Sequence, residues 1–130
     1  MYATIWKNVY RASTGLLALA MLGAGVQDLR HAPELVEAIH RLGYPEYLLS
    51  ILGVAKLTGA ALLCVPRFPH LREWVYAGFA CDFGGAIVSH LVSGDTVAQT
   101  LPALACALLL AVSYAAYRLH APLARRLGGA

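Results

Sequence analysis

The sequence predicts an all-α integral membrane protein: an antiparallel four-helix bundle with a short amphipathic helix between its first and second spans. Hydrophobic residues make up 59% of the 130 residues and charged residues only 13%, whereas soluble domains contain about 25% charged residues. A chain this short cannot bury so much apolar surface within itself. Four apolar segments also approach the ~20 residues that a helix needs to cross a bilayer. We therefore expect one transmembrane domain in a lipid bilayer, with spans over residues 5–27, 46–65, 72–92 and 97–119.

The first span also has the features of a secretory signal, because Lys7 and Arg11 precede a short apolar core and small residues. We expect it to be retained as a span. The segment that follows, residues 27–46, carries signals for a short helix that Pro33 opens and Gly43 ends. We expect this helix to rest on the bundle or the membrane surface through one apolar stripe. The stripe consists of Leu35, Ile39 and Leu42.

Short turns join the remaining spans, PRFPHLR between the second and third and SGDT between the third and fourth. Short connections make consecutive helices antiparallel neighbours. Basic residues then gather on one side of the membrane, which predicts that both termini are cytoplasmic. These residues are Lys7, Arg11, Arg67, Arg72, Arg118, Arg125 and Arg126. They form no continuous run, so the sequence does not indicate a nucleic-acid partner.

Lys56 and Asp82 are isolated charges in the second and third apolar segments. Each is thirteen residues from Pro69 in the connecting turn, so a hairpin would place them at the same height, near the middle of the membrane. Charges at this depth are costly and usually have a partner. We expect an ion pair with two interpretations open. It is either a structural pair that fixes the register of the helices or the base of a polar pocket between them.

Small residues surround this pair. Gly53 and Gly59 flank Lys56 at helical spacing. One face of the third span carries Gly78, Asp82, Gly85 and Ser89. Because small residues let helices approach closely in lipid, we expect Gly53, Gly78 and Ser89 to line the pocket and to contact its ligand.

A second polar group is expected near the outer surface, where Asp28 ends the first span and His90 ends the third. A histidine beside a carboxylate can shuttle protons, so both residues join Lys56 and Asp82 as catalytic candidates. The alternatives are a histidine that is only hydrogen-bonded, and a metal site formed by His90 and Asp28. The five histidines show no metal or haem spacing.

Three residues at the start of the third span have structural explanations beside a role in ligand binding. Glu73 suits a helix N-terminus, and Trp74 and Tyr76 suit the aromatic belt at the inner membrane interface. The cysteines are scattered without a CxxC motif, and we expect free, buried thiols. A redox dithiol between Cys81 and Cys106 is the alternative.

Two stretches, LGYPEYLLSILGVAKLTGAALLCVPRFP (residues 42–69) and LREWVYAGFACDFGGAIVSHLVSGD (residues 71–95), together with the spacing of four spans, resemble the DoxX-like family of small bacterial membrane proteins. The first span matches only in character. The resemblance implies a four-helix bundle in the bacterial inner membrane, in a group associated with thiosulfate–quinone oxidoreductases and oxidative-stress partners. The lack of a CxxC pair argues against direct thiol–disulfide reduction of a quinone. The candidate site positions that fall in these stretches are Lys56, Glu73, Trp74, Tyr76, Gly78 and His90.

The first class of function that fits is an enzyme or enzyme subunit that binds a small lipophilic molecule, such as a quinone- or isoprenoid-like molecule, between its helices. Lys56 would hold or polarise an oxygen of this molecule, and Asp82 would tune Lys56. His90 and Asp28 would transfer protons.

Two other classes also fit. One is a non-catalytic scaffold that recruits a soluble oxidoreductase through a basic cytoplasmic face formed by Arg67, Arg72, Arg125 and Arg126. The other is a carrier or channel, for which four spans are few without oligomerisation. Small-residue faces favour a homo-oligomer. Gly15, Gly23 and Gly84 are the positions that suggest it.

Overall fold

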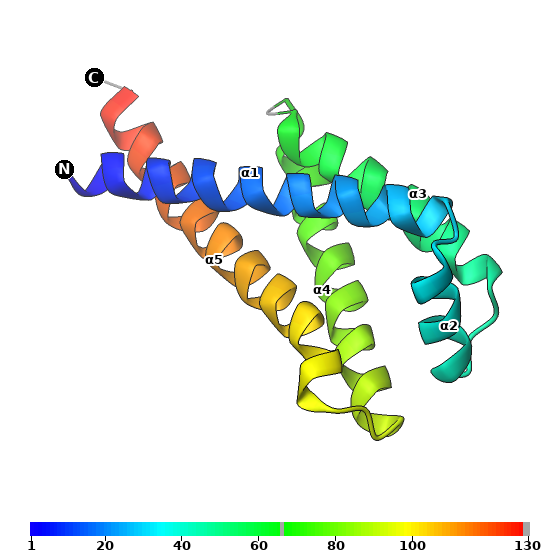
Figure 1. The fold of residues 1–130 in the computed structure, drawn as a ribbon. Helices are drawn as coiled ribbons and strands as arrows, with labels where there is room; N and C mark the ends of the chain where they lie inside the picture. Colours follow the sequence, from blue (N-terminus) through cyan, green and yellow to red (C-terminus); the bar gives the residue numbers. More distant parts are fainter. Residues whose placement is uncertain (66, 129–130) are drawn as a thin grey trace.

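The computed structural model describes the backbone of residues 1–65 and 67–128, and the side chains of residues 1–65 and 67–122. Every regular element in this part of the chain is a helix (Figure 1). The helices are α1 (Tyr2–Leu29), α2 (Pro33–Arg41), α3 (Tyr47–Cys64), α4 (Pro69–Val92) and α5 (Val97–Gly128). Within these residues, four segments are long and apolar enough to span a membrane, namely α1, α3, α4 and residues Val97–Pro122 of α5. The predicted fold class and the short helix between the first two spans are therefore confirmed.

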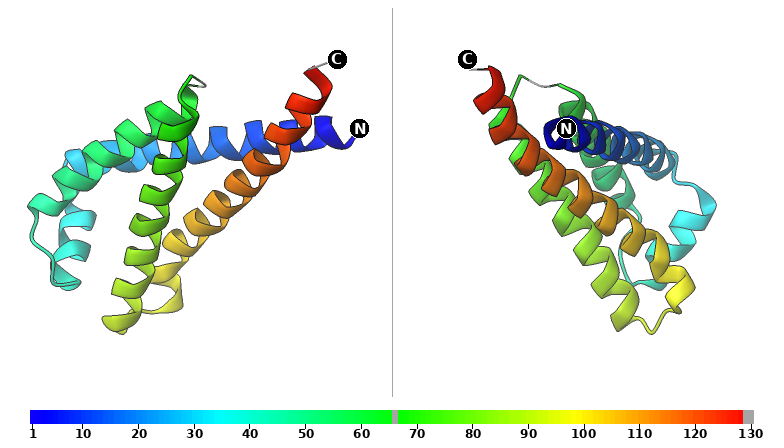
Figure 2. Two further views of the ribbon diagram at one scale, coloured as in Figure 1. Left: turned by 180° about the vertical axis from the view of Figure 1, so that it is seen from behind. Right: turned by 90° about the vertical axis from the view of Figure 1, so that its left-hand side faces the viewer.

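The spans do not pack as a regular bundle. Helix α1 lies across the others and packs chiefly against α3 and α5, while α4 packs chiefly against α5 (Figure 1). Although a short turn joins α3 to α4, the two helices diverge from it (Figure 2). The expected antiparallel contact between chain neighbours therefore holds well for α4 and α5 and only loosely for α3 and α4. The N-terminal end of α1 and the C-terminal end of α5 lie close together.

Two glycines bring α1 and α3 together. A Cβ atom on Gly53 would lie 3.0 Å from the carbonyl oxygen of Gly25, and a Cβ atom on Gly25 would lie 3.1 Å from that of Gly53. Close helix approach through small residues is a common packing mode in lipid. Gly53, which we expected to contact a ligand, is buried where the two backbones meet.

Three helices end in the same hydrogen-bonded motif, with a left-handed residue directly after the C-cap. Gly43 (φ 86°) follows α2 and Gly94 (φ 70°) follows α4. After α1 this position is occupied by His31, with φ 49°, and the amides of His31 and Ala32 bond back to Asp28 and Gln27. The sequence predicted that a helix ends at Gly43, because glycine readily adopts the left-handed conformation. Nothing in the sequence predicts that a histidine adopts it.

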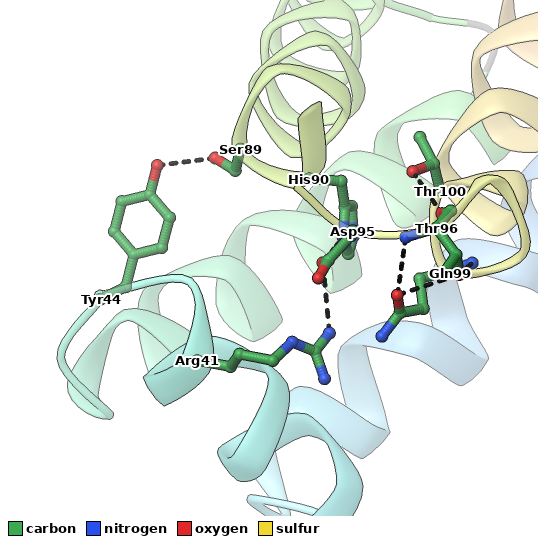
Figure 3. Close-up of polar contacts among 8 residues, drawn as sticks. All are labelled: Arg41, Tyr44, Ser89, His90, Asp95, Thr96, Gln99 and Thr100. Atoms are coloured by element: carbon green, nitrogen blue, oxygen red, sulfur yellow. Dashed lines mark hydrogen bonds and ion pairs between the residues drawn. The ribbon is translucent and has the colours of Figure 1, made fainter. Parts of the chain in front are cut away.

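Polar contacts rather than a buried apolar face hold the segment around α2 in place. Helix α2 has no buried residue, although its predicted stripe of Leu35, Ile39 and Leu42 is half-buried. At its C-terminal end, Arg41 Nη2 lies 3.2 Å from Asp95 Oδ2, and Tyr44 Oη lies 2.7 Å from Ser89 Oγ (Figure 3). The segment is therefore bonded to the end of the α4–α5 hairpin where the two helices are joined.

Candidate functional site

Lys56 lies at the centre of a group of three charges from three different helices. Its Nζ atom is 2.7 Å from Asp28 Oδ2 and 3.8 Å from Asp82 Oδ2. The side chains of Asp28, Lys56 and Asp82 are 5%, 15% and 18% exposed. The two charges that we expected to meet do so, but the hydrogen bond of Lys56 goes to Asp28.

Sequence reasoning missed Asp28 as the main partner of Lys56, because it treated Asp28 as part of a separate outer cluster. The geometry of the helices explains the contact. Side chains of an α-helix lean toward its N-terminus, so those of Asp28 and Lys56 lean toward each other when α1 and α3 run in opposite directions. The close contact of Gly25 with Gly53, three residues before each of them, brings the two helices into range.

A wedge-shaped cavity of about 630 Å³ opens between α3 and α4, beside Lys56 and Asp82. Its lining is mostly apolar and includes Trp74, Gly78 and Phe79. A Cβ atom at Gly78 would meet no atom within 4 Å, so this glycine faces open space. Two of the predicted ligand contacts, Trp74 and Gly78, thus share one cavity with two of the predicted catalytic residues.

A second cavity, of about 430 Å³, lies on the other side of Lys56 between α1, α2 and α3. Its lining includes the polar side chains of Gln27, Asp28 and Glu34 as well as Lys56. Lys56 is therefore exposed to both cavities, and the Lys56–Asp28 ion pair lies between a largely apolar space and a more polar one. Neither Gln27 nor Glu34 was a site candidate from sequence, because only the position of α2 brings Glu34 close to Asp28.

His90 does not pair with Asp28 as expected, because each of the two has another partner. His90 Nδ1 lies 2.6 Å from Asp95 Oδ2, which also accepts a hydrogen bond from Arg41 (Figure 3). The turn after α4 folds Asp95 back onto His90, while Asp28 is bonded to Lys56. The hydrogen bond with His90, and secondarily that with Arg41, holds the pKa of Asp95 below its usual value. Among the described residues, no three His, Cys, Asp or Glu side chains cluster as metal ligands would.

The small residues of α4 do not all line the same cavity. Ser89, a predicted ligand contact, bonds with Tyr44 instead and does not line the wedge. Gly84 lies on another side of α4, where it lines a cavity of about 460 Å³ between α4 and α5. A Cβ atom added to Gly15, Gly23 or Gly84 would meet no atom within 4 Å. The faces that carry these glycines are therefore open, as the prediction of self-association requires.

Tyr76 and Glu73 lie on the side of α4 that faces α5. Tyr76 is 4% exposed, and its hydroxyl lies 2.7 Å from Ser113 Oγ, which in turn lies 2.7 Å from Thr14 Oγ1. The expected position of Tyr76 in an interface belt is therefore wrong. Glu73 accepts a hydrogen bond from Tyr114 and pairs with Arg118. It is not at the helix start, because α4 begins earlier than expected, at Pro69.

Arg72 is buried rather than part of an exposed basic face. It is 9% exposed, and its guanidinium carbon lies 5.9 Å and 5.4 Å from the ring centroids of Tyr10 and Tyr117. Arg72 is therefore not available on the basic face that the scaffold hypothesis requires, whereas Arg67 is exposed. Arg125 and Arg126 lie outside the residues whose side chains the structure describes.

The cysteines are free, as expected, but they are less buried than expected. Cys64 and Cys81 are exposed and Cys106 is half-buried. In apolar helices such exposure is contact with lipid, which suits a thiol as well as a protein interior does. Cys81 also lines the wedge.

A family model described as the DoxX-like family matches residues 12–112. The chain belongs to the DoxX-like family. The matched region contains Asp28, Lys56 and Asp82, so all three charges of the site lie in the DoxX-like part of the chain. No curated protein and no solved structure matches it. What this DoxX-like protein does must therefore be argued from its own geometry.

Proposed function

We propose that this membrane protein binds a small lipophilic molecule in the wedge between α3 and α4. The observation that carries the proposal is the contrast within one cavity: an apolar space of about 630 Å³ with Lys56 and Asp82 at its wall. Ligand sites are typically apolar cavities with a few convergent polar groups. Ionisable residues inside membrane spans are functional candidates by default.

Each charged residue has a distinct part in this proposal. Lys56 Nζ carries three donors and gives one to Asp28, so it retains donors for an oxygen of the ligand. Asp28 anchors Lys56, and Asp82 faces the ligand directly. A quinone- or isoprenoid-like molecule combines the required apolar body and oxygen. The redox-linked interpretation adds that the bound molecule exchanges electrons with an associated oxidoreductase, while this chain positions it.

The tryptophans allow a direct test. The chain has two, Trp6 and Trp74, and Trp74 lines the wedge. In a Trp6→Phe variant in detergent micelles, a short-chain ubiquinone analogue should quench the fluorescence of Trp74 with a saturable dependence on concentration. Quenching that rises linearly without saturation would show only partition into the micelle and would contradict the proposal.

Two glycines on α4 provide matched controls. Gly78 faces the wedge and Gly84 faces the cavity between α4 and α5, and neither would place a Cβ atom within 4 Å of another atom. Gly78→Leu should weaken the saturable quenching because its side chain projects into the wedge and takes up part of its volume. Gly84→Leu should leave it unchanged. Equal loss in both variants would indicate a general effect on α4 and not a site.

We also propose that the protein lies in the bacterial inner membrane with both termini in the cytoplasm. The charge bias of the ends and the proximity of the N-terminal end of α1 to the C-terminal end of α5 (Figure 1) support this orientation. Reporter fusions at the two termini should both report the cytoplasm. A periplasmic signal from either terminus would contradict the orientation without bearing on the wedge.

A further inference from the structure

Two carboxylates and one ammonium lie close together beside the wedge, and of these Lys56 and Asp82 line it. We infer that the molecule bound there is a lipophilic cation, with a hydrocarbon body and an ammonium or delocalised positive charge. This inference rests on the proposed function and narrows the class of ligand. It follows from how the two carboxylates are placed around Lys56.

Two carboxylates share one ammonium. Lys56 donates its 2.7 Å hydrogen bond to Asp28, while Asp82 lies 3.8 Å away. Within the described side chains, neither Asp28 nor Asp82 has a second cationic partner, and Asp82 accepts no hydrogen bond. With both carboxylates ionised, one negative charge stays uncompensated, and Asp82 is the residue that carries it.

The geometry directs this charge into the wedge. Asp82 lines that cavity and not the polar cavity under α2, whereas Asp28 lines only the polar one. An uncompensated charge in a membrane-length apolar segment is costly, so a group that neutralises Asp82 is stabilised strongly. Of the two cavities beside Lys56, the wedge is the one through which a ligand reaches Asp82.

The rest of the lining favours the same class of molecule. Trp74 and Phe79 line the wedge, and aromatic faces attract cations, most strongly when water is excluded. A neutral ligand that accepts a hydrogen bond from Lys56 leaves the charge on Asp82 uncompensated. An anionic ligand brings a second negative charge next to that of Asp82. The combination of carboxylate, aromatic rings and apolar volume therefore favours a cation over both.

Tetraphenylphosphonium and tetraphenylborate are suitable probes, because they are close in size and shape and opposite in charge. In the Trp6→Phe protein in neutral detergent, each probe is titrated while the fluorescence of Trp74 is followed. We expect saturable binding of the cation that is about tenfold or more tighter than that of the anion, the effect of one charge-assisted contact. Equal affinities would overturn the inference.

Substitutions at Asp82 and Gly78, which both line the wedge, make the test more specific. Asp82→Asn removes the uncompensated charge and should lower the affinity for the cation about tenfold, while Gly84→Leu, which lies outside the wedge, should leave that affinity unchanged. An unchanged affinity for the cation in Asp82→Asn protein that elutes as a single folded species would overturn the inference. If Asp82→Asn does not fold, Gly78→Leu tests where the cation binds, since its side chain projects into the wedge and should weaken binding of the cation.

The outcomes separate this inference from the proposed function. Saturable binding of the quinone analogue without selective binding of the cation rejects the inference and supports the proposed function. Saturable binding of neither probe rejects both. Selective binding of the cation that is lost in Asp82→Asn and retained in Gly84→Leu supports both.

Discussion

The charged group of Asp28, Lys56 and Asp82 and the hydroxyl group of Thr14, Tyr76 and Ser113 both connect three helices, but they differ in balance. The hydroxyls satisfy one another at 2.7 Å with no net charge, and Ser113 is fully buried. The charged group has one ammonium for two carboxylates and lines two cavities. This difference teaches that polarity inside a membrane span is not enough to indicate a site. Polar groups whose charges do not cancel and that face a cavity are the better candidates for a binding site.

The largest expected effect comes from removing the shared cation. Lys56→Met leaves Asp28 and Asp82 as two adjacent carboxylates without compensation, which should lower the free energy of unfolding by about 3–5 kcal/mol. Thermal unfolding in detergent measures this loss. The variant that also carries Asp28→Asn and Asp82→Asn should recover most of it, because no charge is then left unpaired. A triple variant as unstable as Lys56→Met would show that the charges are not the cause.

Glycine substitutions should separate helix packing from ligand binding. Gly53→Ala places a Cβ atom 3.0 Å from the carbonyl oxygen of Gly25, so α1 and α3 must move apart, at a cost of about 1–3 kcal/mol of stability. Gly78→Ala introduces the same group into the open wedge and should leave stability nearly unchanged. Equal destabilisation by both, measured by thermal unfolding, would contradict the packing that distinguishes the two positions.

The hydroxyl group should affect stability and not binding. Ser113→Ala leaves the hydroxyls of Thr14 and Tyr76 without their shared partner, which should cost about 1 kcal/mol. The quenching of Trp74 by the quinone analogue should stay the same, since Ser113 does not line the wedge. A weaker affinity for the analogue in this variant would remove the distinction between the two polar groups.

The smallest effect is expected at the turn between α4 and α5, where Asp95 bonds with His90 and Arg41. The pKa of Asp95 is lowered in the folded protein relative to about 3.9 in the unfolded chain. Its contribution to stability is therefore complete above pH ~4 and is lost as the pH falls through the folded pKa. The stability difference between the wild type and Asp95→Asn, measured from pH 7 to pH 3, should shrink over this acidic range. A constant difference would exclude the linkage.

Sequence reasoning located the charged pair correctly because Lys56 and Asp82 are equally spaced from the turn, and this spacing holds even though α3 and α4 diverge. It failed at Asp28, His90 and Tyr76, whose partners depend on which face each helix turns toward its neighbours. Segments that are apolar on nearly all sides carry little information about such faces. The pairing of Asp95 with His90 was missed for a local reason, since it depends on the left-handed turn at Gly94.

The sequence by itself determined the four apolar helices, the short helix between the first two and the membership of a membrane protein family. These properties depend on local composition and length, which add up residue by residue along the chain. Only the tertiary structure decided that α3 and α4 diverge to leave a wedge and that Asp28 reaches Lys56. Both follow from the contact of Gly25 with Gly53, which draws α3 toward α1, and such a contact between distant segments has no counterpart in local pattern.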